Sequence, residues 1–417
     1  MPPAIHPAKA VPANREEVCE LLRQASAERR KVLPFGHGTK LGMGGAGQPI
    51  DLAISLERLS SICEYPASDL TITVEAGLPL RDLAAALAEK RQMLPLDVPF
   101  ADRATVGGTI AANVNGPRRL GYGSWRDIVL GVHYVTADGK LAKGGGRVVK
   151  NVAGYDIPKL LIGSLGTLGV IVAVTFKVFP LPPAQATLVM GFRTPAQAAQ
   201  AAQRIVHSQL LPQALDLIDA PAAGLIHQER WLHAPCTLLA AIAGPAEVLA
   251  RFERDLPVMV RPQGLESVQW LQEDQENELW RSVREITPAF LAAHPDGAVV
   301  KASLPLASMS EFLEQARAVS QQHALNAATL ARAGSGIVYS MFWPKEGRPP
   351  IAAGVEWLIR QAEQRGGRAV VEWCPENLQG TLNRWGTLGD DFPAMRQLKA
   401  ALDPGRILSP GRFYGGI

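Results

Sequence analysis

The chain has 417 residues, of which 47% are hydrophobic and 19% charged, the composition of a soluble globular protein too long for one ordinary core. Its formal net charge of +3 is too small to indicate a nucleic-acid or membrane surface. The four cysteines lie far apart without a Cys-x-x-Cys pair. This spacing predicts neither an iron–sulfur cluster nor a structural zinc site, and it suits a reducing compartment.

Targeting signals are not visible in the sequence. The N-terminal residues lack a basic segment followed by an apolar core, so we expect no signal peptide. No apolar run approaches the roughly 20 residues that a membrane-spanning helix needs. We therefore expect a cytoplasmic protein, with any membrane association at the inner face and through partner subunits.

Hydrophobic periodicity predicts alternating helices and strands over the first 180 residues. A helix should follow Asn14 and Glu17, which are spaced as a capping pair, and another should carry Leu80, Leu83 and Leu87 on one side. A helical turn is expected at 157–161. The expected strands are 32–35, 71–76, 128–136 and 170–178, with a hairpin turn at Asp138 and Gly139 after the third.

The pattern changes after the proline-rich segment 179–183, which is typical of a linker. Strands and helices then alternate in the βαββαβ order of ferredoxin-like units, seen once loosely and once clearly. Such units build an antiparallel sheet with helices on one face. The expected strands are 188–192, 214–218, 237–243, 298–304, 327–331, 337–343 and 368–373, and the expected helices are 195–207, 245–256, 309–322 and 351–364.

Three glycine-rich segments lie beside strands in the first 180 residues, at 34–40, 104–109 and 163–169. Glycine lets backbone N–H groups approach a bulky anion without an intervening Cβ, and the serine and threonine hydroxyls add donors. One such segment indicates little, because tight glycine-rich connections are common. Three that converge would form the N–H-lined cradle that a pyrophosphate needs.

Two familiar phosphate-binding motifs do not fit. The chain has no Gly-x-x-x-x-Gly-Lys-Ser/Thr segment, which excludes a nucleoside-triphosphatase loop. Residues 42–47 match Gly-x-Gly-x-x-Gly, but Gln48 and Pro49 follow where a dinucleotide-binding Rossmann motif requires a helix.

The order of the glycine-rich segments resembles the vanillyl-alcohol-oxidase family, whose FAD-binding domain is of the PCMH type. The resemblance is carried by residues 34–39, 104–113, 151–156, 163–171 and 403–414. Within that family, residues 116–119, 124–127 and 149–156 are most similar to the FAD-binding E subunit of glycolate oxidase (glycolate dehydrogenase).

The resemblance implies an α+β fold in three parts. Residues 1–180 would form a two-subdomain PCMH-type FAD-binding domain, and residues 181–401 a ferredoxin-like cap with an antiparallel sheet. Residues 402–417 would return to pack on the FAD domain.

The resemblance also implies which residues contact FAD. Those expected to meet the pyrophosphate, the ribityl chain, the adenine or the flavin are Pro34, Gly36, His37, Gly38, Thr39, Thr105, Gly107, Gly108, Gly163, Ser164, Gly166, Thr167, Gly169 and Ile171. A valine at position 166 would then fill space that the cofactor needs. Some relatives tether the flavin through a histidine at a position that corresponds here to Gly38, so we expect non-covalent FAD.

Oxidation of a 2-hydroxy acid needs a base for the hydroxyl proton and a cation for the carboxylate. Relatives carry a metal site rich in histidine and glutamate in the cap. Here His227 and His233 do not share a helix face and have no third ligand at a suitable spacing, so we expect no metal. The candidate catalytic residues are Arg118, Tyr155 and Arg332, and a surface or packing role explains each equally well.

Three functions follow from these observations. In the first, the chain is the FAD-binding subunit of a glycolate oxidase complex and works with a second flavin subunit and an iron–sulfur subunit on glycolate. In the second, it is a stand-alone FAD-linked oxidoreductase of another small alcohol or hydroxy acid. In the third, it is a non-catalytic FAD relay or scaffold subunit.

Overall fold

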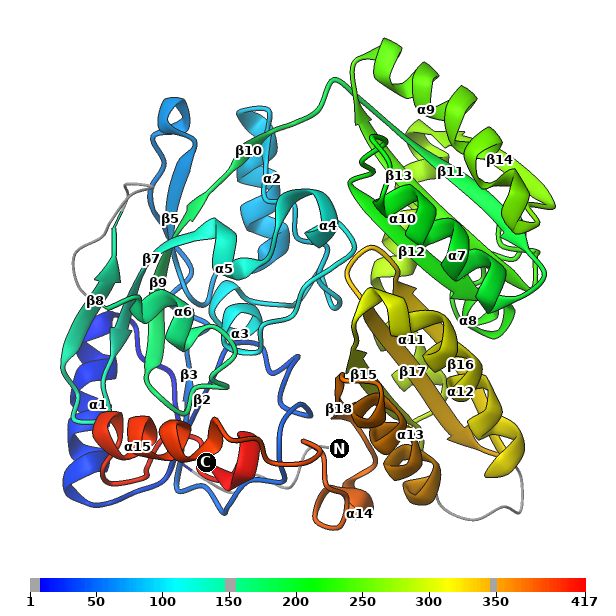
Figure 1. Cartoon of the computed structure of the whole chain (residues 1–417). Coiled ribbons are helices and arrows are strands. Elements are labelled where there is room, and N and C mark those ends of the chain that lie inside the picture. The colour runs from blue at the N-terminus through cyan, green and yellow to red at the C-terminus, as the bar shows by residue number, and fades with distance from the viewer. Residues whose placement is uncertain (1–7, 147–154, 346–350) are drawn as a thin grey trace. The chain divides into compact units, whose positions relative to one another are not determined.

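The structure is a computed structural model that describes residues 8–146, 155–345 and 351–417 (Figure 1). Its contacts divide the chain into two units. The first contains Met1–Asn115, Gly123–Leu181 and Thr387–Ile417, and the second contains Gly116–Tyr122 and Pro182–Gly386. The C-terminal return to the first unit thus begins at Thr387, earlier than residue 402. The short segment Gly116–Tyr122 belongs to the second unit, although first-unit residues flank it.

The first unit contains a small parallel sheet and a larger antiparallel sheet. The small sheet has the order β1 (Ala8–Ala10), β3 (Leu52–Ser55), β2 (Val32–Phe35). The larger one has the order β4 (Ile62–Glu64), β5 (Thr71–Glu75), β9 (Val170–Lys177), β7 (Val129–Val135), β8 (Leu141–Gly145), and β6 (Gln92–Met93) pairs with β10 (Phe179–Pro180). Its helices are α1 (Arg15–Ala27), α2 (Leu80–Glu89), α3 (Val106–Ala111), α5 (Trp125–Ile128), α6 (Ile157–Leu161) and α15 (Phe392–Leu402), with 3₁₀ turns at Ala67–Asp69 and Tyr414–Gly416.

Local sequence explains why these elements form. The Asn14 side chain accepts the N–H of Glu17 and so caps α1, as the sequence predicts. Strand β9 lies between β5 and β7, and seven of its eight residues are buried because both of its faces are covered. Trp125 is fully buried against Phe176, and its indole N–H donates to the carbonyl of Val114 at 2.7 Å. These contacts fix β9, the strand that follows the third glycine-rich segment.

The second unit is built on one antiparallel sheet of eight strands. In sheet order they are β14 (Ser267–Gln272), β11 (Ala184–Phe192), β13 (Cys236–Gly244), β12 (Ala214–Asp219), β16 (Leu325–Arg332), β17 (Ile337–Pro344), β15 (Ala298–Ser303) and β18 (Arg368–Trp373). Each half of this order is that of a βαββαβ unit, and the halves join where β12 pairs with β16. The ferredoxin-like fold is therefore confirmed and occurs twice.

Helices cover both faces of this sheet, and not one face as the sequence led us to expect. One layer contains α7 (Pro195–Val206), α9 (Ala246–Val260), α12 (Met309–Gln322) and α13 (Ala352–Gln364). The other contains α8 (Ala220–Leu225), α10 (Glu273–Arg284) and α11 (Ile286–Ala293). The remaining elements are α4 (Arg119–Tyr122), α14 (Glu376–Gln379) and 3₁₀ turns at Arg261–Gln263 and Leu306–Ser308. The additional layer arises because α10 buries Leu279, Trp280 and Val283 against the sheet.

A pH-dependent contribution to stability is expected from Asp219, which caps α8. Its side chain accepts the N–H of Ala222 at 2.9 Å, but burial raises the pKa of this carboxyl from 3.8 to about 6. Between about pH 4 and 6 the folded chain keeps a proton here that the unfolded chain has released, so stability falls as the pH rises through this window. The variant Asp219→Asn should therefore melt at a higher temperature than wild type at pH 7 and at nearly the same temperature at pH 4. Thermal unfolding measures this difference. If the melting temperatures of the variant and the wild type differed equally at pH 4 and pH 7, the prediction would be contradicted.

Candidate cofactor site

The three glycine-rich segments meet at one cavity in the first unit. It encloses about 700 Å³, including its open mouth. Its walls are Pro34, Phe35, Gly36, His37, Gly38, Thr39, Lys40, Leu41, Leu56, Ala76, Thr105, Gly107, Gly108, Ala111, Ala112, Leu165, Gly166, Gly169, Val170, Ile171 and Arg412. The first segment leaves β2, the second opens α3, and the third precedes β9. The three glycine-rich segments therefore converge on one cavity, as the sequence predicts.

Close backbone contacts hold the three segments together. A Cβ on Gly36 would lie 2.1 Å from the hydroxyl oxygen of Thr105, so the first and second segments can approach this closely only with glycine at position 36. The N–H of Leu165 donates to the carbonyl of Ala111 at 2.8 Å, and the N–H of Gly163 to that of Ile110 at 3.0 Å. These two bonds attach the third segment to the end of α3.

The cavity wall is rich in hydrogen-bond donors. In the described part of the chain, no acceptor takes the backbone N–H groups of residues 36–39 or that of Gly108. Five N–H groups at or beside a concave surface can serve an anion with several oxygens. The donor set thus fits the diphosphate of a dinucleotide.

Two basic side chains add positive charge to the same wall, and none of the described residues that line it is an aspartate or a glutamate. The Lys40 ammonium is buried, donates to the carbonyl of Pro99 at 3.0 Å and lies 4.4 Å from the ring centre of Phe100. The Arg412 guanidinium donates to the carbonyls of Leu41 at 2.9 Å and Met43 at 2.6 Å. Both side chains thus place positive charge at the cavity wall, where it would favour a bound anion.

The residues expected at the cofactor divide into two groups. Most of them line the cavity: Pro34, Gly36, His37, Gly38, Thr39, Thr105, Gly107, Gly108, Gly166, Gly169 and Ile171. Gly163, Ser164 and Thr167 are not part of its wall. The hydroxyl of Thr167 donates to the carbonyl of Ser164 at 2.7 Å, and both side chains are buried. This hydrogen bond therefore stabilises the third loop without forming part of the cavity wall.

His37 and Lys40 connect the first loop to the chain that leads into the second. Nδ1 of His37 lies 3.0 Å from the carbonyl oxygen of Arg103, which places the proton on Nδ1. The residue after it, Gly38, adopts a φ of +75°, which suits glycine.

Lys40 and Arg412 were not among the expected cofactor residues. Lys40 directly follows residues 34–39 and Arg412 lies within residues 403–414, two segments that carry the family resemblance. Their place in the sequence is the feature that could have indicated a role at the cofactor site.

The three candidate catalytic residues are distributed over both units. Tyr155 belongs to the first unit and is 92% exposed. Arg118 and Arg332 belong to the second, where Arg332 ends β16 and forms a buried ion pair with Asp216 of β12. The motif residues 149–154, immediately before Tyr155, lie outside the described residues.

Arg332 is one member of a charged cluster on the sheet of the second unit. Nζ of Lys301 lies 3.2 Å from a carboxylate oxygen of Glu372, and Lys301 and Arg332 each lie 5.8 Å from the ring centre of Tyr339. Burial lowers the pKa of Lys301, but Tyr339 and Glu372 outweigh it and raise this pKa above its ordinary value. Burial raises the pKa of the Tyr339 phenol. Nε of Arg332 is buried without an acceptor among the described residues.

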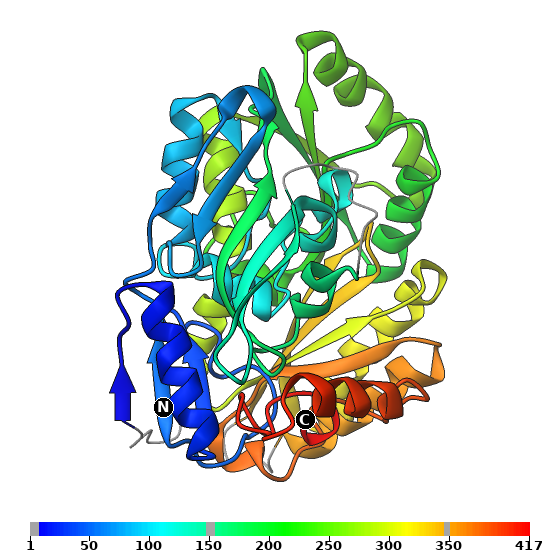
Figure 2. The ribbon, with the colours of Figure 1, turned by 90° about the vertical axis from the view of Figure 1, so that its left-hand side faces the viewer.

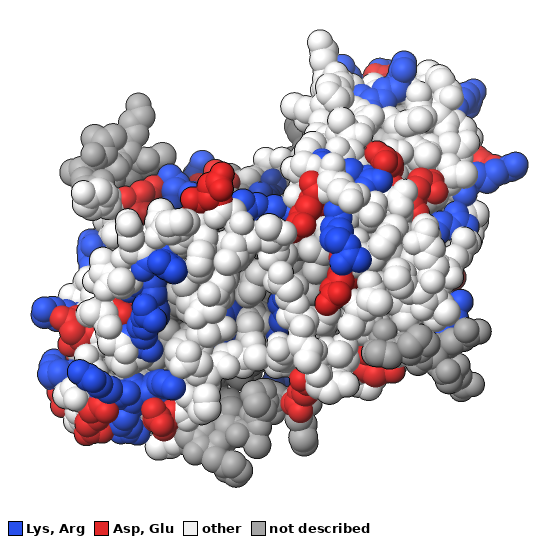
Figure 3. Space-filling view, turned by 60° about the horizontal axis from the view of Figure 1, so that its bottom comes forward, with Lys and Arg blue, Asp and Glu red and all other residues white. Residues whose placement is uncertain are grey.

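The described surface and the remaining titratable side chains do not indicate a particular ligand. Within the described ranges, no three His, Cys, Asp or Glu side chains are grouped as metal ligands would be. In the same ranges every helix falls short of the length or apolar character that crossing a bilayer requires. On the face shown in Figure 3, basic and acidic side chains are interspersed and neither sign forms a continuous surface.

Comparison with known proteins gives matches over almost the whole chain. A family model described as an FAD binding domain matches residues 7–145, and one described as FAD linked oxidases, C-terminal domain, matches residues 181–364 and 387–413.

Individual proteins extend these matches. The glycolate oxidase subunit GlcD of Bacillus subtilis is 26% identical over 97% of this chain and 88% of its own length. The glycolate oxidase subunit GlcE of Escherichia coli is 37% identical, but the match covers 47% of this chain and 55% of that protein. The crystal structure of p-cresol methylhydroxylase with substrate bound has a TM-score of 0.76 over 97% of this chain and 88% of that one, at 16% identity, which establishes the PCMH-type fold.

Proposed function

Because the chain belongs to the FAD-linked oxidases, we propose that it binds FAD non-covalently in the cavity of the first unit and oxidises a small 2-hydroxy acid, with glycolate as the reference substrate. FAD is the cofactor of this family, and the chain is an FAD-linked oxidoreductase acting on CH–OH groups. The observation that carries the proposal is the donor-lined cavity to which all three glycine-rich segments contribute.

The residues of the first unit would bind and orient FAD. The N–H groups of residues 36–39 and Gly108 would hold the diphosphate, while Lys40 and Arg412 supply positive potential. At the position of the histidine tether stands Gly38, and His37 is already engaged with the Arg103 carbonyl, which favours a dissociable cofactor. When bound, FAD supplies a two-electron acceptor for the substrate carbon.

The second unit supplies a candidate site for the substrate carboxylate. Arg332 keeps a buried Nε–H available, and Lys301 adds a second cation on the same cluster. Glu372, held by Lys301, is the carboxylate of this cluster that could accept a proton. These roles of Arg332, Lys301 and Glu372 are part of the proposal. Arg118 and Tyr155, the other two candidate catalytic residues, remain candidates within it.

Electron transfer out of the chain needs another protein in this proposal. The chain has four widely separated cysteines and no iron–sulfur motif. Two of its relatives are named as glycolate oxidase subunits. We therefore propose a cytoplasmic complex with a second flavin subunit and an iron–sulfur subunit, which contacts a membrane only through those partners.

The length of the matches favours a second candidate function. The GlcD subunit aligns over 97% of the chain, whereas the GlcE subunit aligns over 47%. A chain that is similar to GlcD throughout could oxidise a hydroxy acid without a second flavin subunit. A relay or scaffold role without a substrate is the third alternative.

Anaerobic reduction of the purified yellow protein separates these functions. Bleaching of the flavin absorbance at about 450 nm by glycolate, lactate or another 2-hydroxy acid alone would support autonomous oxidation. Bleaching only after partner subunits are added would support the complex. A flavin that no hydroxy acid reduces under either condition would support the relay role, and a folded protein that cannot bind added FAD would contradict the proposal.

A further inference from the structure

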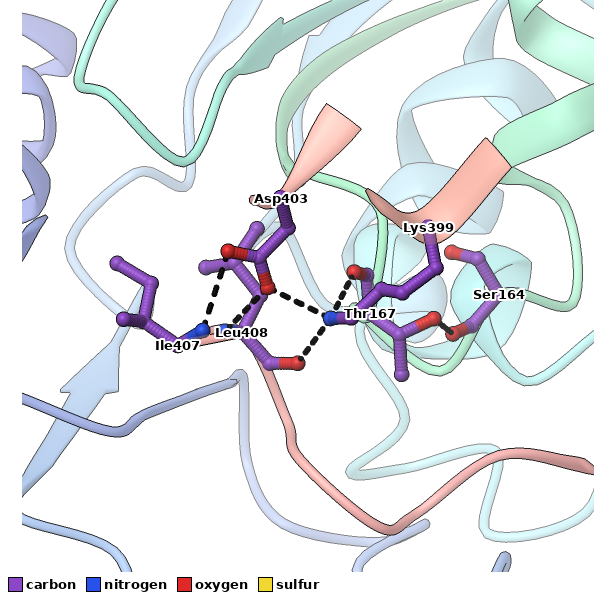
Figure 4. A network of polar contacts seen from close by, with 6 residues as sticks. All are labelled: Ser164, Thr167, Lys399, Asp403, Ile407 and Leu408. Atoms are coloured by element: carbon purple, nitrogen blue, oxygen red, sulfur yellow. Dashed lines mark hydrogen bonds and ion pairs between the residues drawn. The ribbon is translucent and has the colours of Figure 1, made fainter. Parts of the chain in front are cut away.

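The C-terminal segment contributes a buried ion pair to the back of the cofactor cavity. Lys399 is the buried residue of α15, and its ammonium donates to Asp403 Oδ2 at 2.6 Å, to the carbonyl of Thr167 at 2.8 Å and to that of Leu408 at 3.0 Å (Figure 4). An ammonium has three donors, so these acceptors use its full capacity. Thr167 lies in the third glycine-rich loop, between Gly166 and Gly169, which line the cavity.

Asp403 organises the other side of the same network. Its carboxylate is fully buried and accepts the N–H of Ile407 at 3.1 Å and that of Leu408 at 2.9 Å. Besides its bond to Lys399, it thus holds the turn that follows α15 in a fixed shape. Figure 4 shows the carboxylate between the turn and the ammonium.

The segment then continues along the first loop. Leu408 lies beside Val32 in a parallel bridge, in which the N–H of Val32 donates to Ile407 at 2.7 Å and that of Ser409 donates to Val32 at 2.8 Å. Val32 begins β2, the strand that leads into the first glycine-rich loop. Figures 1 and 2 show α15 at the same end of the first unit as this small sheet. Arg412 completes the contact through the carbonyls of Leu41 and Met43.

We infer that residues 399–412 form an element of the cofactor site, in which Lys399 and Arg412 are positioning residues that hold the third and first loops at the spacing FAD requires. Lys399 acts through the backbone of Thr167, and Arg412 through the backbone of residues 41–43. The inference rests on the proposed cofactor cavity, because it assigns the segment to FAD binding and not only to packing.

The first test compares two variants that separate stability from loop position. Lys399→Met leaves a buried unpaired carboxylate on Asp403, whereas Lys399→Met combined with Asp403→Asn removes that charge and keeps a side-chain acceptor for the turn. Both lose the bond to Thr167. We expect both to bind FAD about tenfold or more weakly than wild type, measured by flavin fluorescence titration of the apoprotein. The melting temperature should recover in the double variant while the affinity does not.

The matched control is Lys159→Met, which breaks an exposed Lys–Asp pair with Asp156 in the same unit. It should leave FAD affinity and melting temperature at wild-type values. FAD affinity that returns together with the melting temperature in the double variant would overturn the inference, because Lys399 would then act on stability alone.

A second measurement uses wild type and needs no variant to fold. Backbone amides of residues 403–412 should exchange with deuterium more slowly when FAD is bound, because the loops and the segment would then order one another. Equal exchange with and without FAD, in protein that demonstrably binds it, would overturn the inference and leave the proposed function intact. Failure of wild type to bind FAD would instead overturn the cavity assignment itself.

Discussion

Replacing Gly108 by leucine is expected to weaken FAD binding about a hundredfold or more while the protein remains folded. Gly108 lines the cavity within α3, and a Cβ built on it would have one neighbour within 4 Å, the Thr105 hydroxyl oxygen at 3.1 Å. A longer side chain would therefore extend into space that the cofactor needs. Because leucine forms helices better than glycine, the substitution should not weaken α3.

The measurement is a titration of the apoprotein with FAD, with melting temperature recorded alongside. Gly380→Leu is the matched control, because Gly380 is an exposed glycine at the end of α14, and a Cβ added there would have no neighbour within 4 Å among the described residues. This control should bind FAD as wild type does. Gly108→Leu protein with normal FAD affinity would show that the cofactor does not occupy the cavity.

Gly166 is a poorer probe of the same site than the sequence suggested. Its φ is +74°, and an added Cβ would lie 3.0 Å from the Pro34 ring and 3.3 Å from the Ser409 hydroxyl oxygen. A valine at this position would strain the backbone and press on neighbouring protein. Loss of FAD in Gly166→Val could therefore come from a distorted loop, and it would not report on the cavity directly.

Replacing Arg332 by methionine is expected to lower the free energy of unfolding of the second unit by about 3–5 kcal/mol. Asp216, its partner, is fully buried, so the substitution removes the cation of an ion pair inside the sheet. Replacing both residues, as in Arg332→Met with Asp216→Leu, should restore most of the loss because the buried charge is then gone. Urea unfolding followed by circular dichroism measures these differences.

The control for this prediction is Arg193→Met, which breaks an ion pair with Glu266 on the surface of the same unit. An exposed pair of this kind contributes about 0–1 kcal/mol, so this variant should unfold close to wild type. If Arg332→Met and Arg193→Met lowered the free energy of unfolding by similar amounts, the Asp216 carboxyl would be neutral or compensated by another group. A double variant as unstable as the single one would exclude the charge as the cause.

Much of the fold could be predicted because the apolar residues of many helices and strands recur at the period of that element. The strand at Val32–Phe35 and the helix at Met309–Gln322 have the predicted bounds, since their apolar residues recur at the spacing of their element. Strand β14 was missed because only half of its residues are apolar, without a regular alternation, and it lies at an edge of the sheet. The second helical layer was missed because α10 carries three acidic residues in its first turn and shows its apolar side only once packed.

The candidate site divides in the same way. Glycine, serine and threonine beside strands indicated the three loops, and their order indicated the family. Lys399 and Asp403, by contrast, have the i, i+4 spacing of an ordinary surface ion pair on a helix. Only the tertiary fold shows that both are buried and that Thr167, far away in sequence, supplies a further acceptor.

The path of the backbone has a consequence for how the protein matures. The chain passes between the units four times, at 115/116, 122/123, 181/182 and 386/387, so neither unit is one continuous stretch. The first and third glycine-rich loops are synthesised long before residues 399–412, which contact both of them. A nascent chain on the ribosome would carry these loops without their support. Loading of the cofactor is then a late event of biosynthesis, after the second unit has already emerged.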